Sequence, residues 1–172
     1  MKKVIFVIPQ RNFNDKEYSR TKEVLEANLV KVEVSSITED ECVGMYGLRV
    51  KPEKSVREIR VEEYDALVMI GGSGSPKLMD YPEVLNIISE FNRRKKIIAA
   101  ICLAPVILAK TGILKGVMVT VFPVDWAIAS LKEGGAHYSD KHVIVDGNII
   151  TADGPDSAEK FAVEIVKELK KI

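Results

Sequence analysis

The chain has 172 residues, of which 47% are hydrophobic and 29% are charged, and its 25 Lys and Arg residues balance 25 Asp and Glu residues. This length suits one domain spanning residues 1–172, and this composition excludes general disorder. The neutral balance argues against nucleic acid as a partner, because proteins that bind a polyanion normally carry a basic excess. No apolar run approaches the ~20 residues that span a bilayer, so no membrane partner is expected. The two cysteines, Cys42 and Cys102, make no disulfide framework, and a reducing cytoplasm is the expected compartment.

Apolar runs and amphipathic segments alternate along the chain. The runs predict buried strands, and the segments between them space their apolar residues as helices do. The expected strands are 4–8, 30–34, 66–70, 97–102, 118–122 and two pieces within 143–152; the expected helices are 15–28, 82–93, 105–114, 125–132 and 157–170. Residues 42–59 read as a small hairpin excursion because glycines and a proline interrupt short alternating pieces. This order predicts an α/β fold in which helices cover both faces of a mostly parallel sheet.

In such a sheet the active crevice lies beyond the carboxyl ends of the strands. The residues to consider are therefore those that directly follow each expected strand. They fall in the segments 9–17, 71–76, 102–105, 122–126 and 152–156. Phe122 and Trp126 could line a pocket there, or could simply pack in the core.

Cys102 ends an expected strand, and Pro105 falls in the first turn of the next helix, where a missing N–H does no harm. Ala100 and Ala104 flank the cysteine at two residues on either side, and small residues are needed there because strand and helix cross closely at a nucleophile elbow. The helix N-terminus would favour the thiolate, and nearby backbone N–H groups would stabilise an oxyanion. The alternative is that Cys102 is a small buried hydrophobe.

Gly71 and Gly72 follow the preceding strand in the same crevice. A glycine there lets the backbone approach a ligand closely, so the N–H groups of Gly72 and Leu103 are the expected oxyanion donors. A dinucleotide fingerprint is the competing interpretation, but position 77 is not a third glycine and Pro76 stands where the helix should begin. A turn that needs positive φ would be compatible with either interpretation. No cofactor is expected.

The segment Ala99-Ala-Ile-Cys-Leu-Ala-Pro105 after Ile70-Gly-Gly72, with Phe13-Asn-Asp-Lys-Glu17 near the start and Asp146-Gly-Asn-Ile-Ile-Thr-Ala-Asp-Gly-Pro155 near the end, resembles the ThiJ/PfpI family. This family includes the parkinsonism-associated deglycase and the archaeal intracellular peptidases. The resemblance covers nearly the whole chain. It implies a flavodoxin-like three-layer sandwich and a homodimer or larger homo-oligomer.

The resemblance also implies that Glu17 hydrogen-bonds the elbow cysteine. The residues agree with this role, because Glu17 lies at the start of the first expected helix on the crevice side, where a carboxyl could donate a proton or accept one. The alternative role is a favourable interaction with the helix dipole, which Asp15 would share.

Several positions depart from the family pattern. Peptidase-like members carry His directly after the cysteine, where this chain has Leu103; other members carry it in a Thr-His-Pro segment, where this chain has Phe122. The family often has Arg where this chain has Asp153, which reverses the charge of that pocket candidate. His137 and His142 are expected to be solvated or structural residues near a sheet edge. The two histidines and two cysteines also lack the spacing of metal ligands, so no metal is expected.

The leading hypothesis is an enzyme in which the Cys102 thiolate attacks a small reactive carbonyl, as in glyoxalase- or deglycase-like members, with Glu17 moving the proton. This chemistry needs no histidine. An intracellular cysteine peptidase or amidase would need an imidazole near the sulfur, supplied by His137 or His142 across a subunit contact. A third hypothesis is a non-catalytic redox sensor or chaperone, whose Cys102 is oxidised to a sulfinate held by Glu17 while Cys42 stays structural.

Overall fold

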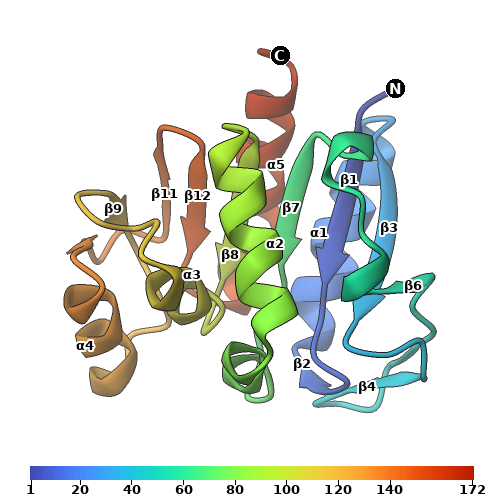
Figure 1. Ribbon diagram of the computed structural model, residues 1–172, viewed down its shortest axis with the longest axis horizontal. Helices are drawn as coiled ribbons and strands as arrows, with labels where there is room; N and C mark the ends of the chain where they lie inside the picture. The colour runs from blue at the N-terminus through green and yellow to red at the C-terminus, as the bar shows by residue number, and fades with distance from the viewer.

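The computed structural model describes all residues, 1–172, and its centre is a seven-stranded sheet (Figure 1). Every neighbouring pair in this sheet is parallel except the pair at one edge, β11 and β12. The order across the sheet is β11 (Val143–Asp146), β12 (Ile149–Ala152), β8 (Ile97–Ile101), β7 (Ala66–Met69), β1 (Lys3–Val7), β3 (Lys31–Ser36) and β6 (Lys54–Ser55). The predicted mostly parallel α/β architecture is confirmed.

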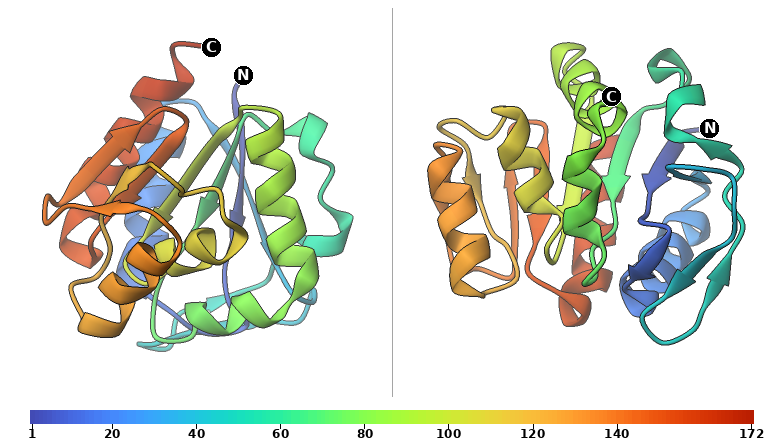
Figure 2. Two further views of the ribbon diagram at one scale, coloured as in Figure 1. Left: turned by 60° about the vertical axis from the view of Figure 1, so that its left-hand side comes forward. Right: turned by 60° about the horizontal axis from the view of Figure 1, so that its bottom comes forward.

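Helices cover both faces of the sheet, which makes three layers (Figures 1 and 2). On one face lie α1 (Asp15–Ala27) and α5 (Ala158–Leu169), which contact each other. On the other face lie α2 (Pro82–Arg93) and α3 (Pro105–Thr111), with α4 (Asp125–Glu133) packed against α3. Short 3₁₀ helices lie at η1 (Val56–Glu58), η2 (Val61–Glu63), η3 (Ser75–Asp80) and η4 (Pro155–Ser157).

Alternation along each buried strand divides the core between the two faces. In β1, Ile5 and Val7 pack in the cluster beneath α2 and α3, whereas Val4 and Phe6 pack in the cluster beneath α1 and α5. Successive side chains of a strand point to opposite faces, so a strand buried on both faces must be apolar throughout. Each fully buried side chain of this size contributes roughly 1.5–3 kcal/mol. The continuous apolar runs therefore predicted these strands correctly.

Two small sheets lie outside the main one. β4 (Cys42–Gly44) pairs antiparallel with β5 (Arg49–Val50), which confirms the predicted hairpin for residues 42–50, and parallel with β2 (Arg11–Phe13), which the sequence did not predict. The rest of the expected excursion is wrong, because β6 joins the main sheet beside β3 and Val56 and Ile59 pack in the core. β9 (Met118–Val119) pairs with β10 (His137–Tyr138). The expected strand 118–122 is thus wrong beyond residue 119: the N–H of Thr120 donates to the side-chain Oγ1 of Thr151 in β12 (3.0 Å) and not to a backbone carbonyl of a neighbouring strand.

Strand order reverses between β1 and β7, because the chain leaves β1 for β3 on one side and returns to β7 on the other. The carboxyl ends of these two strands are the position where ligands bind in open α/β sheets. The loops that follow β1, β7 and β8 meet at this edge of the sheet (Figure 2). None of the helices is long and apolar enough to cross a membrane.

Candidate functional site: a cysteine and a buried carboxyl

Cys102 lies between the end of β8 and the start of α3, in a strained backbone conformation. Its φ is +63°, a left-handed value that few non-glycine residues adopt and that costs of order 1–3 kcal/mol. The turn is fixed from both sides: the N–H of Cys102 donates to the carbonyl of Ala152 (2.9 Å), and its carbonyl accepts from the N–H of Phe122 (2.8 Å). The flanking Ala100 and Ala104 are fully buried, as the close crossing of strand and helix requires. Only 6% of Cys102 is exposed.

Glu17 is the other side chain of the site, and it is completely buried in the first turn of α1. Asn14 caps this helix by accepting the N–H of Glu17 at its Oδ1 (3.0 Å). The N–H of Gly71 donates to Oε1 of Glu17 (3.0 Å). Oε2 has no nitrogen or oxygen partner, and the carboxyl faces the Cys102 thiol. One carboxyl oxygen is thus anchored, while the other is free to interact with the sulfur or with a group bound to it.

Glycines allow this close approach. A Cβ on Gly71 would lie 2.6 Å from both Cβ of Cys102 and Oε1 of Glu17. Gly72 has a φ of +117°, and a Cβ there would lie 2.5 Å from the backbone N of Asn14. Any side chain at either position would push apart the loops that hold the cysteine and the carboxyl. The N–H groups of Gly72 and Leu103 both act on the sulfur of Cys102 and lower the pKa of its thiol.

Burial governs the protonation of the pair. It raises the pKa of Glu17 from 4.5 to about 8, although the neighbouring Cys102 thiol and the hydrogen bond from the Gly71 N–H act in the opposite direction. Glu17 is therefore mostly a neutral acid near pH 7. Burial also raises the pKa of the Cys102 thiol, and so does the negative charge of Glu17 once it ionises; the N–H groups of Gly72 and Leu103 lower it. The position of Cys102 at a helix N-terminus predicts a lowered pKa for the thiol. In this site, however, desolvation by burial outweighs the N–H groups of Gly72 and Leu103, and the pKa is raised.

A hollow of about 300 Å³ is lined by Phe122, Asp153 and His142 among others. His142 Nδ1 lies 2.7 Å from Oδ2 of Asp153, whose Oδ1 accepts from Oγ of Ser157 (2.6 Å). The imidazole itself is largely exposed. Of the pocket candidates from the sequence, Phe122 and Asp153 line this hollow, whereas the half-exposed Trp126 does not.

Glu17 and the N–H groups of Gly72 and Leu103 are the groups that shift the pKa of the Cys102 thiol, and neither histidine is among them. His142 lies near a sheet edge, directly before β11, and its link to Asp153 was not predicted. Asn14 was also missed, although an Asn directly before an expected helix is a recognised capping signal. Cys42 is buried and free. The structure contains no group of three or more His, Cys, Asp or Glu side chains arranged to hold a metal ion.

Comparison with known proteins identifies relatives of nearly the whole chain. A family model described as DJ-1/PfpI family matches residues 2–168. An uncharacterized protein of Methanocaldococcus jannaschii is 43% identical over 170 residues, which cover 98% of this chain and 83% of that protein. An uncharacterized protein of Staphylococcus aureus is 35% identical, with 99% of this chain and 100% of that protein covered.

Solved structures agree in fold. A ThiJ/PfpI domain protein from Brachyspira murdochii superimposes with a TM-score of 0.94 at 30% identity, covering 99% of this chain and 97% of that one. Drosophila melanogaster DJ-1beta superimposes with a TM-score of 0.87 at 29% identity, covering 98% and 91%.

Proposed function

Since the chain belongs to the DJ-1/PfpI family and carries a cysteine at the elbow, we propose that it is a cysteine-dependent enzyme acting on small reactive carbonyls such as methylglyoxal. The observation that carries the proposal is the pairing of Cys102 with a fully buried carboxyl whose second oxygen has no other polar partner. An acid–base group with a pKa of about 8 beside a nucleophile suits the transfer of a proton near neutral pH. The 6% exposure of the cysteine suits a small substrate better than a peptide.

The proposed reaction begins when the sulfur of Cys102 adds to the aldehyde carbon of methylglyoxal. The S–C bond forms, the thiol proton passes to the aldehyde oxygen, and the N–H groups of Gly72 and Leu103 stabilise the charge that develops on that oxygen. Glu17, as carboxylate, then removes the hydrogen from the former aldehyde carbon and returns it to the neighbouring ketone carbon, while the hydroxyl proton on the former aldehyde oxygen passes to the ketone oxygen. The product is a lactoyl thioester, and water hydrolyses it to lactate and the free thiol. The net change is addition of water to methylglyoxal, without an external oxidant or reductant.

The direct test is methylglyoxal consumption with detection of lactate, in the absence of any added cofactor. The wild type is expected to turn over, and Cys102→Ser is expected to lose at least 99% of the rate because the serine hydroxyl is a far weaker nucleophile. Cys42→Ser is the matched control, since it changes the same atom of another buried cysteine, and it should keep the wild-type rate. Equal rates in wild type and Cys102→Ser would contradict the proposal.

A redox role is the second candidate, favoured by the protonated carboxyl that lies beside Cys102. A neutral Glu17 could donate a hydrogen bond to a sulfinate oxygen. Two molecules of hydrogen peroxide would then oxidise the sulfur to a sulfinate and be reduced to water. Mass spectrometry of the treated protein would detect two added oxygen atoms at Cys102 and none at Cys42. If the wild type oxidises in this way and shows no carbonyl turnover, this candidate replaces the first.

The peptidase alternative has less support, because neither histidine acts on the pKa of the Cys102 thiol and His142 pairs with Asp153 instead. An imidazole from a second copy of the chain would be required, and a homo-oligomer remains part of the proposal. Light scattering after size-exclusion chromatography measures the mass in solution. A monomer would exclude a site completed by a partner subunit.

A further inference from the structure

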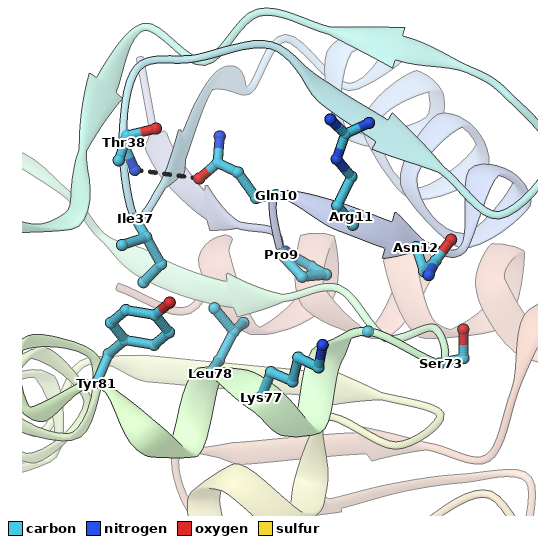
Figure 3. A pocket seen from close by; sticks show the side chains of 11 residues that line it. Pro9, Gln10, Arg11, Asn12, Ile37, Thr38, Ser73, Lys77, Leu78 and Tyr81 are labelled. Atoms are coloured by element: carbon cyan, nitrogen blue, oxygen red, sulfur yellow. Dashed lines mark hydrogen bonds between the residues drawn. The ribbon is translucent and has the colours of Figure 1, made fainter.

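We propose that the protein has a second small-molecule site, separate from Cys102, that binds a phosphate monoester carrying a flat or apolar group. The site is a pocket of about 260 Å³ between the loops that follow β1, β3 and β7 (Figure 3). Neither Cys102 nor Glu17 lines it. This inference goes beyond the proposed carbonyl chemistry and does not depend on it.

The pocket lies at the point where the strand order reverses. Its walls come from Pro9–Asn12 after β1 and from Ser73–Leu78 after β7, the two strands between which the order changes. Loops diverge at such a point because the connections run to opposite sides, which leaves a crevice at the carboxyl ends of the strands. The position therefore suits a ligand on topological grounds alone.

The charge in the pocket is unbalanced. Arg11 and Lys77 both line it, and no acidic residue does. Neither cation takes part in any salt bridge or side-chain hydrogen bond within the molecule. Two cations at one hollow that no acidic residue lines favour an anionic ligand. An arginine and a lysine together are a common means of binding phosphate.

The two cations lie toward one side of the pocket, and the apolar side chains lie toward the other. Figure 3 shows Asn12 and Ser73 on the same side as the two cations. Ile37, Leu78 and Tyr81 lie toward the other side, where Gln10 and Thr38 add polar groups. Inorganic phosphate would contact only the side that carries the cations, whereas a phosphate monoester with a planar or apolar group would contact both sides.

The walls are already fixed without a ligand. The amide of Gln10 donates to the carbonyl of Asp40 (2.7 Å) and accepts from Oγ of Ser36 (2.9 Å) and the N–H of Thr38 (3.1 Å). The N–H of Gly74 donates to the carbonyl of Asn12 (3.0 Å), joining the loop after β7 to the loop after β1.

No side chain fits at Gly74, because a Cβ there would collide with the carbonyl oxygen of Arg11. A binding site whose backbone is held in this way loses little conformational entropy when the ligand enters.

The test is calorimetric titration at low ionic strength with three probes: AMP, ribose 5-phosphate and adenosine. AMP is expected to bind saturably with one site per chain, ribose 5-phosphate at least threefold more weakly, and adenosine at least tenfold more weakly. Arg11→Gln/Lys77→Gln should weaken AMP binding at least tenfold. The matched control is Lys132→Gln/Lys160→Gln, which removes the same charge from exposed lysines on α4 and α5 and should bind AMP as the wild type does.

Two further variants separate the parts of the proposal. Tyr81→Ala should weaken AMP binding but leave the binding of ribose 5-phosphate unchanged, because only the base would lie against that ring. Cys102→Ser should bind AMP as tightly as the wild type, so a failure of the carbonyl chemistry leaves this result untouched. The proposal is overturned if AMP shows no saturable binding at millimolar concentration, or if the Arg11/Lys77 variant binds it as tightly as the control variant.

Discussion

Glu17→Gln is expected to stabilise the protein above neutral pH and at the same time to lower cysteine-dependent turnover at least hundredfold. The stabilisation follows from the pKa of about 8 for the buried carboxyl, against an ordinary value of 4.5. The folded state binds this proton more tightly than the unfolded state does, so the free energy of unfolding falls as the pH rises from about 4.5 to about 8. Below that range both states are protonated and the cost vanishes.

Ionising the buried Glu17 lowers the free energy of unfolding by at most roughly 5 kcal/mol, because each tenfold change in proton affinity corresponds to about 1.4 kcal/mol. Glutamine carries no charge, so the variant does not lose this free energy at high pH. Urea unfolding at several pH values between 5 and 9 should show a steep decline for the wild type and a shallower one for Glu17→Gln. Glu39→Gln, which alters an exposed glutamate outside any ion pair, should keep the wild-type slope. Parallel curves for wild type and Glu17→Gln would show that the carboxyl is already ionised at low pH.

The loss of turnover follows from the proton transfer, because a positioned acid–base group contributes typically 10²–10⁴-fold and an amide cannot replace it. In the wild type kcat/KM should rise with pH until about pH 8, as Glu17 loses its proton, and Glu17→Gln should lack this rise. If the Glu17 carboxyl had only a structural role, the turnover rate of Glu17→Gln would change in the same direction as its stability. A Glu17→Gln variant that is more stable and much slower would therefore show that the carboxyl takes part in proton transfer.

Gly72→Ala is expected to be among the most destabilising single changes in the chain, at about 4 kcal/mol or more. Its Cβ would lie 2.5 Å from the N of Asn14 and 2.7 Å from the carbonyl carbon of Phe13, and both are backbone atoms that cannot rotate away. The positive φ of +117° adds strain. The loops that hold Cys102 and Glu17 would have to separate.

Gly112→Ala is the control for this prediction. Gly112 also has a positive φ, +86°, but no atom lies within 4 Å of the place its Cβ would take. It should cost only about 1 kcal/mol, which is the strain alone. Equal losses of unfolding free energy in urea for the two variants would show that the crowding at Gly72 is relieved by small movements.

Much of the architecture followed from local pattern. The helix 82–93 was predicted with both ends correct, because Pro82 suits a first turn and the apolar residues repeat at helical spacing. The strands predicted at 66–70 and 97–102 from continuous apolar runs are β7 and β8, each one residue shorter in the structure. The elbow at Cys102 and the two glycines before it were visible because proline, glycine and small residues restrict the backbone wherever they occur.

Other features depended on contacts between segments far apart in the sequence. Arg11–Phe13 has no strand pattern and becomes β2 only because Cys42–Gly44 lies beside it. The antiparallel pairing of β11 with β12 brings His142 to Asp153. The local sequence around Arg11–Phe13 and around His142 does not predict which distant segment lies beside it.

The sequence by itself determined the order of the elements, the face that each buries and the presence of a cysteine at a sharp turn, because these depend on side-chain size, apolar spacing and backbone freedom over a few residues. Only the tertiary structure decided the protonation of the site. The desolvation that raises the pKa of Glu17, and the loss of a polar partner at its second oxygen, arise because α1, β7 and β8 close around it. The pKa of a buried group depends on every group within several ångströms of it. At Glu17 these groups come from segments that are far apart in the sequence.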